Sequence, residues 1–364
     1  MEYYLFLTDR CNISCSYCSA GRVVSRKEGR LFPKERFPEL VEFIKRNRKY
    51  QKNGSKEDIV IFFGGEPLLE WQLIEDFFKS AEGLDVRYGL YTNGLLLKSV
   101  PVDVLNNLDV LFVSFDGDKN SHEKHRGRGT YDRIIDNLKE LRGRLRCTVL
   151  GRITVEEETD LFSSVTNILG SFVDAVYWQI VNKPRFNDPQ GFIRRYREGA
   201  ERLFRLWIER LGEGQPLNII PIQAIVASLL FSYNGDVSFR CGAGSVHRTI
   251  DVDGNIYWCD EYVGDERGRI GHITDSVPPL DVFVHHTALF EDCKDCDVAP
   301  ICLGRCRKAL TEYSTEQKRL YCAMTRYLIN LVREGIGEIK EVVDQRGYRL
   351  EDIYQGPYWT EEIP

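Results

Sequence analysis

The sequence predicts a parallel α/β fold followed by a small cysteine-rich domain, and three observations support this prediction. Through the first half of the chain, short apolar runs rich in β-branched and aromatic residues alternate with longer segments of helical period. The pattern breaks near residues 182–190, where turn-forming residues gather. Seven of the eleven cysteines then fall between Cys241 and Cys322. Strand-then-helix repetition is typical of a parallel sheet with helical crossovers, either open or closed into a barrel.

The apolar runs are the expected strands, because strands of a parallel sheet are buried on both faces. They are Tyr3–Thr8, Ile59–Phe63, Val86–Tyr91, Asp109–Phe115, Arg146–Ile153 and Ala175–Ile180. The expected helices are Phe37–Tyr50, Glu70–Ala81, Tyr131–Leu141 and the charged, amphipathic segment Phe192–Leu211. We therefore expect a barrel over 1–215, a bridging segment over 216–240, a cysteine-rich domain over 241–325 and a C-terminal tail over 326–364.

Composition restricts the class of protein. The 364 residues suffice for one large and one small domain, and 43% hydrophobic with 29% charged residues is typical of a soluble globular chain. A net charge of −6 predicts no nucleic-acid partner. We find no apolar run that could cross a membrane and no signal peptide, so we expect a cytoplasmic protein. Thiols stay reduced there, so the eleven cysteines favour metal or cluster ligation over disulfides.

Three cysteines follow directly on the first expected strand: Cys11, Cys15 and Cys18. Loops at the C-terminal ends of the strands carry the active sites of α/β barrels. Three thiolates can hold a cubane iron–sulfur cluster by three irons and leave the fourth iron open, as catalytic metal sites require. A zinc site completed by a distant residue is the alternative that this spacing leaves open.

Polar motifs also follow the next three expected strands. Gly64-Gly65-Glu66-Pro67 follows the second, Thr92-Asn93-Gly94 ends the third, and Ser114-Phe115-Asp116-Gly117 ends the fourth, with Arg126 shortly after. Glycines let the backbone approach a ligand, a carboxylate can pair with an ammonium, and a guanidinium binds a carboxylate by two hydrogen bonds. Each motif alone is compatible with an ordinary turn. Together, at consecutive strand ends, they predict a single ligand site.

With these motifs in this order, residues 1–180 resemble the radical SAM superfamily, whose signature is a C-x3-C-x2-C loop after the first strand. The resemblance implies a partial (β/α)6 barrel and a [4Fe–4S] cluster whose open iron binds S-adenosylmethionine (SAM). An electron from the cluster would cleave SAM and yield a 5′-deoxyadenosyl radical. The implied cofactor-binding residues are Tyr17 near the adenine, Gly64, Gly65, Glu66 and Pro67 at the SAM amino group, Asn93 at the end of the third strand, and Ser114 and Arg126 at the SAM carboxylate.

The C-terminal cysteines follow a second pattern. It reads Cys241-x12-Gly254-x4-Cys259, then Cys293-x2-Cys296-x5-Cys302-x3-Cys306-x15-Cys322. Cysteine pairs alone would also suit zinc ribbons. The order resembles the SPASM domain, a seven-cysteine extension of radical SAM enzymes that binds two auxiliary [4Fe–4S] clusters. By this resemblance, the inner cluster would be held by Cys241, Cys259 and Cys306, and the outer one by Cys293, Cys296, Cys302 and Cys322.

The resemblance leaves the inner cluster one protein ligand short. Some relatives carry a further cysteine where this chain has His247, and an imidazole can replace a thiolate in some clusters. The alternative is an iron left open to a substrate atom or water, which we favour because cubane clusters mostly use cysteine. Cys147 lies inside an expected strand and is assigned no function.

One residue is expected to act as a catalytic base. Asp260 directly follows Cys259, at the position where sulfatase maturases have a proposed general base. The alternatives are that Asp260 caps a turn, or that the neighbouring Glu261 takes the role.

The resemblance predicts an enzyme that uses three [4Fe–4S] clusters and SAM to oxidise or crosslink a side chain of a ribosomal peptide. Formylglycine formation, as in anaerobic sulfatase maturases, is the runner-up. Two non-enzymatic alternatives are an electron-transfer protein, which needs no SAM pocket, and a zinc-stabilised binding module. The expected partners are a peptide or protein substrate and an external electron donor of flavodoxin or ferredoxin type. Because the cysteine loop begins at residue 11, no recognition domain is expected before the barrel.

Overall fold

The computed structural model describes residues 1–21, 23–25, 27–47, 58–233, 240–277, 291–304, 306–356 and 362–364. The chain divides into two compact units. Unit 1 comprises Met1–Phe115, His122–Val149 and Gly242–Phe283, and unit 2 comprises Asp116–Ser121, Leu150–Cys241 and Val284–Pro364. Neither unit is therefore a continuous stretch of sequence.

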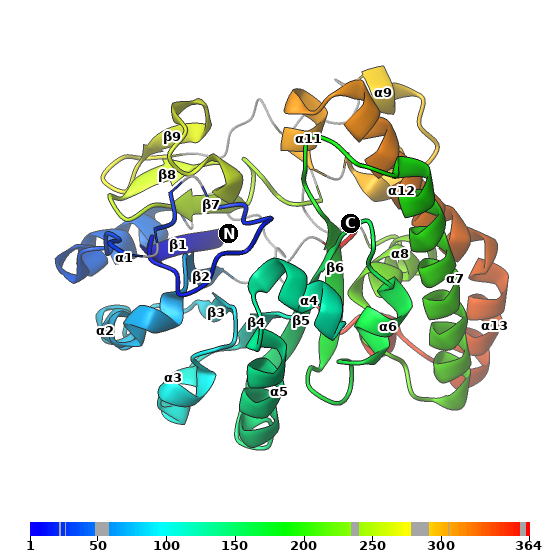
Figure 1. The fold of residues 1–364 in the computed structure, drawn as a ribbon, viewed down its shortest axis with the longest axis horizontal. Helices are drawn as coiled ribbons and strands as arrows, with labels where there is room; N and C mark the ends of the chain where they lie inside the picture. Colours follow the sequence, from blue (N-terminus) through cyan, green and yellow to red (C-terminus); the bar gives the residue numbers. More distant parts are fainter. Residues whose placement is uncertain are drawn as a thin grey trace. The chain divides into compact units, whose positions relative to one another are not determined.

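Unit 1 is built on a sheet in which β1 occupies a central place (Figure 1). The strand order is β4-β3-β2-β1-β7-β8-β9. β1 pairs in parallel with β2 and β7, and β3 and β4 extend the parallel part. β8 and β9 add an antiparallel edge. The strands are β1 (Glu2–Thr8), β2 (Ile59–Gly64), β3 (Arg87–Thr92), β4 (Val110–Ser114), β7 (His247–Ile250), β8 (Asn255–Tyr257) and β9 (Arg269–His272).

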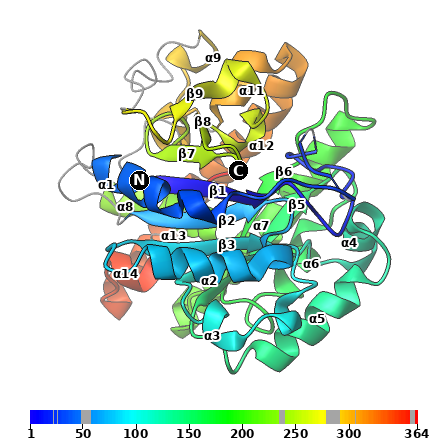
Figure 2. The ribbon, with the colours of Figure 1, turned by 90° about the vertical axis from the view of Figure 1, so that its left-hand side faces the viewer.

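Helices cover one side of strands β1–β4 (Figures 1 and 2). They are α1 (Phe37–Asn47), α2 (Trp71–Ser80), α3 (Val102–Leu105) and α5 (Thr130–Leu141), and α4 (Lys119–Arg126) follows β4. α1 buries positions of helical period, among them Phe37, Leu40 and Ile44, as an amphipathic surface helix does. Phe77 of α2 packs edge-on against Phe37 at 5.3 Å and against Phe62 of β2 at 5.6 Å between ring centroids. These contacts hold the helical layer on the sheet.

Unit 2 contains most of β5 (Thr148–Val155), which pairs in parallel with β6 (Ala175–Ile180). Two long helices, α7 (Pro189–Glu213) and α12 (Thr315–Glu334), pack against each other. Asp188 caps the start of α7 by accepting from Gly191 N at 2.9 Å, and Ser314 and Gln317 form a capping box at the start of α12. The other helices are α6 (Leu161–Thr166), α8 (Ile220–Phe231), α9 (Glu291–Lys294), α10 (Ala299–Cys302), α11 (Arg307–Glu312), α13 (Ile336–Arg346) and α14 (Leu350–Ile353).

The predicted α/β class is confirmed, and each of the six predicted strands is present within two residues of its expected bounds. The helix predicted over 37–50 ends at Asn47, and residues 48–50 lie outside the described residues. The predicted bridging segment contains α8, whose first eight residues are all buried, so it lacks the amphipathic period that reveals a helix. The predicted tail is largely helical, because α12 extends into it and α13 and α14 follow.

In the part of the chain that the structure describes, no helix combines the length and the apolar character needed to cross a membrane.

Candidate functional site

The loop that carries Cys11, Cys15 and Cys18 leaves the C-terminal end of β1 in unit 1. Cys11 N donates to Ser25 O at 2.9 Å, and Cys18 N donates to Cys15 O at 3.3 Å, so backbone bonds shape the loop. Burial raises the pKa of the Cys11 thiol to about 11, and nearby negative charge on Glu66, Cys15 and Cys18 adds to the rise. Charge on Cys15 and on Cys18 is therefore felt at the Cys11 thiol.

The two glycines after β2 let that strand's loop lie against the backbone of the cysteine loop. Gly65 N donates to Thr8 O at 2.9 Å, and Glu66 N donates to Arg10 O at 2.7 Å. A Cβ on Gly65 would lie 1.9 Å from Arg10 O and 3.1 Å from Cys11 N. Gly64 has a φ of +124°, and a Cβ there would lie 2.3 Å from Thr8 O. Glycine is thus required at both positions. At Gly65 a side chain would clash with the backbone, and at Gly64 a side chain would clash and the positive φ would also be strained.

Glu66 lies inside the protein with a relative exposure of 0%. Its carboxylate accepts three hydrogen bonds: from Leu68 N at 3.1 Å, from Thr92 Oγ1 at 2.8 Å and from Asn93 N at 2.7 Å. Burial raises the pKa of Glu66 to about 7, although these three donors oppose the rise. The carboxylate therefore ties the loop after β2 to the end of β3. Pro67, which is also buried, begins the short 3-10 helix Pro67–Glu70 behind it.

Asn93, at the end of β3, reaches the cysteine loop directly. Its side-chain amide donates to Asn12 Oδ1 at 2.7 Å, and its oxygen accepts from Leu95 N at 3.1 Å. Asn12 stands between the first two cysteines in the sequence. The ends of β1, β2 and β3 are therefore joined by side-chain and backbone hydrogen bonds.

The end of α4 contacts the other side of the cysteine loop. Arg126 is buried, its Nη1 lies 3.9 Å from Cys15 Sγ, and its guanidinium lies 5.3 Å from the ring centroid of Tyr17. His125 contacts the same loop in three ways. Ser16 N donates to its carbonyl at 3.0 Å, and Ser16 Oγ lies 2.7 Å from its Nδ1. The ring centroids of His125 and Tyr17 are 5.0 Å apart. Our sequence reasoning missed His125, although it precedes Arg126.

Ser114 is the last residue of β4 and is half-buried. The structure thus brings together Tyr17, Gly64, Gly65, Glu66, Asn93 and Arg126 around the cysteine loop, with Pro67 and Ser114 at the ends of neighbouring elements.

The C-terminal cysteines are divided between the units. Unit 2 contains Cys293 in α9, Cys296 in the turn after it, Cys302 at the end of α10, Cys306 before α11, Cys322 in α12, and Cys241. Cys296 N donates to Cys293 O at 3.2 Å, so this pair shares one turn. Helix α10 packs against α12, which places the elements of Cys302 and Cys322 side by side. Cys259 belongs to unit 1.

Two further residues, His247 and Asp260, have defined surroundings. His247 is buried in β7, its ring stacks on Tyr4 at 4.1 Å, and its Nε2 lies 2.9 Å from Thr249 Oγ1. Burial and the adjacent Arg248 lower the pKa of His247 to about 3, so this imidazole is neutral. Asp260 begins a short 3-10 helix, and its Oδ1 accepts from Cys259 Sγ at 3.6 Å.

Cys147, which received no function, is buried next to the start of β5.

Among the described residues, no three histidine, cysteine or acidic side chains are gathered tightly enough to enclose a metal ion. We therefore test whether an iron–sulfur cluster fits the cysteine loop by the ligand atoms that the loop offers. Three thiols stand on one loop, with a guanidinium next to Cys15. Because thiolates are the ligands of such clusters, ligation would displace the thiol protons. The donor set fits a cluster held by three thiolates.

The fold and this donor set define a class: an α/β enzyme with a cysteine-bound cofactor at the C-terminal ends of parallel strands. Residues 5–161 match the Radical SAM superfamily. Residues 5–161 therefore carry a radical SAM domain, and the resemblance predicted from the strand-end motifs is confirmed.

Known proteins resemble this chain over most of its length. A cysteine-type anaerobic sulfatase-maturating enzyme of Clostridium novyi is 24% identical over 338 residues, which cover 83% of this chain and 86% of that protein. The structure of anSMEcpe with bound AdoMet and Cp18Cys peptide aligns with a TM-score of 0.70 and 17% identity over 93% of this chain and 99% of that one. Streptococcus suis SuiB bound to its precursor peptide SuiA aligns with a TM-score of 0.57 and 16% identity over 84% and 71%. At these identities, the solved structures show a shared fold.

Proposed function

We propose that this enzyme uses SAM to oxidise or crosslink a side chain of a peptide substrate. One observation carries the proposal: the loop after β2, the end of β3 and the end of α4 all contact the cysteine loop that follows β1. Backbone contact at Gly65, the amide pair of Asn93 and Asn12, and Arg126 beside Cys15 all join at this loop. An electron relay or a structural zinc site would not require contacts from four separate elements on one cysteine loop.

The residues of this loop cluster would divide the binding of the cofactors. Cys11, Cys15 and Cys18 would hold a [4Fe–4S] cluster, which supplies the electron that splits SAM into methionine and a 5′-deoxyadenosyl radical. Arg126, with Ser114, would bind the SAM carboxylate, since a guanidinium can bind it with two hydrogen bonds. Tyr17, already under the guanidinium of Arg126, would lie along the adenine.

Glu66 would act mainly as a positioning residue. Its three hydrogen bonds and its full burial support a role in fixing the loop of Gly64 and Gly65, so that backbone groups of this loop face the SAM amino group. A change at Glu66 would then weaken SAM binding by moving that loop.

Two auxiliary clusters would complete the cofactors. We assign Cys293, Cys296, Cys302 and Cys322 to the outer cluster, and Cys241, Cys259 and Cys306 to the inner one. The surroundings of His247 support the open-iron alternative for the inner cluster, because its ring is stacked on Tyr4 and its Nε2 faces Thr249. Auxiliary clusters suit an oxidation, since an electron must leave the substrate after hydrogen abstraction.

The substrate class is inferred from relatives that bind peptides, namely anSMEcpe with its Cp18Cys peptide and SuiB with SuiA. Asp260 would be the base that takes the proton lost by the reacting thiol or hydroxyl. Formylglycine formation is the second candidate. It is favoured by the match to a sulfatase-maturating enzyme over 83% of this chain.

One experiment separates the two candidates. The anaerobically reconstituted enzyme is given SAM, dithionite and either a cysteine-containing sulfatase peptide or a synthetic candidate precursor peptide. Crosslinking predicts a product that has lost two hydrogen atoms and kept its sulfur, whereas formylglycine formation predicts loss of sulfur. SAM consumption with no peptide of either kind modified would contradict the proposal of a peptide substrate.

A further inference from the structure

A buried ion pair in unit 2 joins Arg240 to Glu362. Arg240 Nη1 lies 3.7 Å from Glu362 Oε2, and the two side chains are 2% and 5% exposed. The hydroxyl of Tyr354, which is also buried, donates to the other oxygen of the same carboxylate. Apolar side chains of similar volume often stabilise a protein as well as a buried ion pair does, so the pair is weak evidence for a role in stability alone.

Arg240 connects two segments that carry proposed cluster ligands. It immediately precedes Cys241 in the sequence, and its Nη2 donates to the carbonyl oxygen of Ile301, which immediately precedes Cys302. Helix α10, which contains Ile301 and Cys302, packs against α12, which contains Cys322. The guanidinium is therefore anchored one residue away from a proposed ligand of the outer cluster.

The charge of this guanidinium acts on that ligand. Burial lowers the pKa of Arg240, and negative charge on Glu362 and on Cys302 opposes the fall. Negative charge on Cys302 is therefore felt at the guanidinium, and the charge of the guanidinium is felt at Cys302. An iron–sulfur cluster is more negative by one charge when it is reduced, so charge near its ligands shifts its reduction potential.

The carboxylate of Glu362 is held near the same helices by the residues that follow it. Thr325 Oγ1 of α12 donates to Pro364 O at 2.6 Å, and Ile363 is 1% exposed. Thr325 follows Cys322 by three residues, which is about one helical turn. Glu362 therefore has a fixed place close to the elements that carry two outer-cluster ligands.

We propose that the ion pair of Arg240 and Glu362 sets the reduction potential of the outer cluster, with Glu362 offsetting the positive charge that Arg240 brings to Cys302. The inference rests on the proposed function, which assigns that cluster to Cys293, Cys296, Cys302 and Cys322. Four thiols are a complete donor set for a [4Fe–4S] cluster. By offsetting the guanidinium, the carboxylate keeps the potential lower than Arg240 alone would make it.

The test is a redox titration of the reconstituted full-length protein, followed by electron paramagnetic resonance. The transition that disappears when Cys293 and Cys296 are both replaced by alanine identifies the outer cluster. Glu362→Gln removes one negative charge, so the ratio of reduced to oxidised outer cluster at a fixed applied potential should rise on the order of tenfold. Glu362→Asp keeps the charge and should change this ratio by less than about twofold. The double variant Arg240→Gln/Glu362→Gln, in which the pair has no net charge, should return the ratio to within about threefold of the wild type.

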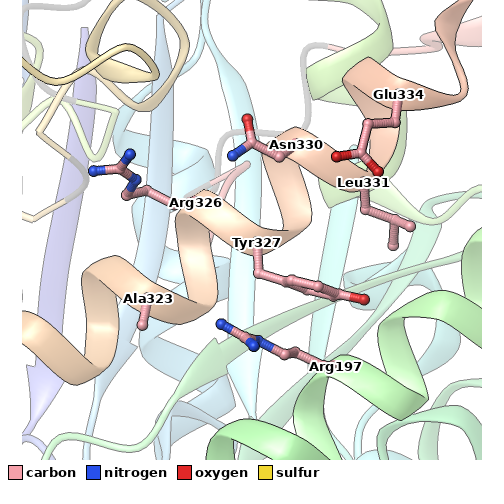
Figure 3. Close-up of a pocket in the computed structure, with 7 residues that line it drawn as sticks. All are labelled: Arg197, Ala323, Arg326, Tyr327, Asn330, Leu331 and Glu334. Atoms are coloured by element: carbon pink, nitrogen blue, oxygen red, sulfur yellow. The ribbon is translucent and has the colours of Figure 1, made fainter.

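Glu334→Gln is the matched control, because it makes the same chemical change at another carboxylate of unit 2. Glu334 lies in α12, about 18 Å along the helix from Cys322. It lines a groove of about 300 Å³ between α7 and α12, in which Figure 3 shows Arg197 of α7 reaching toward the ring of Tyr327. The control should change the ratio of reduced to oxidised outer cluster by less than about twofold.

Iron content separates charge from structure. An unmoved outer-cluster potential in Glu362→Gln, with the iron content of the wild type, would overturn the inference and leave the proposed function standing. Iron lost from Glu362→Gln but kept by the double variant would still assign the effect to charge. Iron lost from both variants would give the pair a purely structural role and overturn the inference. A wild type that holds no more than about four irons per chain would instead refute the auxiliary clusters of the proposed function.

Discussion

Replacing Gly65 with alanine tests whether the loop after β2 and the cysteine loop touch through their backbones. The new Cβ would stand 1.9 Å from Arg10 O, whereas real Cβ contacts are essentially never shorter than 3.0 Å. Both sides of the contact are backbone, so no side chain can rotate away. One loop must move by about 1 Å, because protein interiors leave no spare room.

The cost follows from the two interactions that this movement disturbs. Overpacking costs about 1–3 kcal/mol, and the hydrogen bond from Glu66 N to Arg10 O, now 2.7 Å, contributes about 1 kcal/mol. We expect Gly65→Ala to lower the free energy of unfolding of the metal-free protein by about 2–4 kcal/mol. Because Cys11 follows Arg10, the variant should also lose about four of about twelve irons per chain after reconstitution.

Urea unfolding followed by circular dichroism measures the first effect, and iron analysis measures the second. The matched control is Gly143→Ala. A Cβ there has no neighbour within 4 Å, and the backbone of Gly143 is not left-handed. This control should keep all its iron and be unchanged or slightly more stable, by up to about 1 kcal/mol. A Gly65→Ala protein with the stability and iron content of the wild type would refute the close contact that we describe.

Three further residues give separate predictions. Burial raises the pKa of Glu66 to about 7 from an ordinary value of 4.5, so the folded state favours the protonated acid. The free energy of unfolding should therefore fall by about 3 kcal/mol as the pH rises from 4.5 to 7, because the unfolded state loses this proton first. Glu66→Gln should flatten that part of the pH profile of urea unfolding, and an unchanged profile would contradict the raised pKa. Arg126→Ala should weaken SAM binding by about 1.5–3 kcal/mol, measured by calorimetry, because it removes charge-assisted hydrogen bonds to the SAM carboxylate. The variant should keep its full iron content. SAM affinity equal to that of the wild type would place the carboxylate site elsewhere. Asp260→Asn should keep its iron and release 5′-deoxyadenosine but form no modified peptide, and product at the wild-type rate would assign the base to Glu261 or to the substrate.

The parts of the fold that the sequence predicts well are those in which local pattern and tertiary position agree. The strands are apolar runs, so their positions can be read from the sequence. The polar motifs stand at the strand ends, and parallel pairing brings those ends together, so Asn93 and Gly65 converge on the cysteine loop. Helix α8 could not be predicted in this way, because its buried residues surround it on all sides and show no period.

Other features depend on contacts that no local pattern encodes. The motif suggests that Glu66 faces a ligand, but its carboxylate turns inward to Thr92 and to the backbone of Asn93, a pairing that only the β2–β3 register brings about. The groove of Arg197 and Tyr327 joins residues separated by more than a hundred positions in the sequence, and it exists only because α7 packs on α12.

The most direct test of the account is the triple substitution of Cys11, Cys15 and Cys18 by alanine. We assign these thiols the cluster that cleaves SAM, and we assign seven other cysteines to two further clusters. The reconstituted variant should therefore hold about eight irons instead of about twelve, and it should form no 5′-deoxyadenosine from SAM with dithionite. If the variant still cleaves SAM, the site that we have described at the end of β1 is not where the chemistry begins.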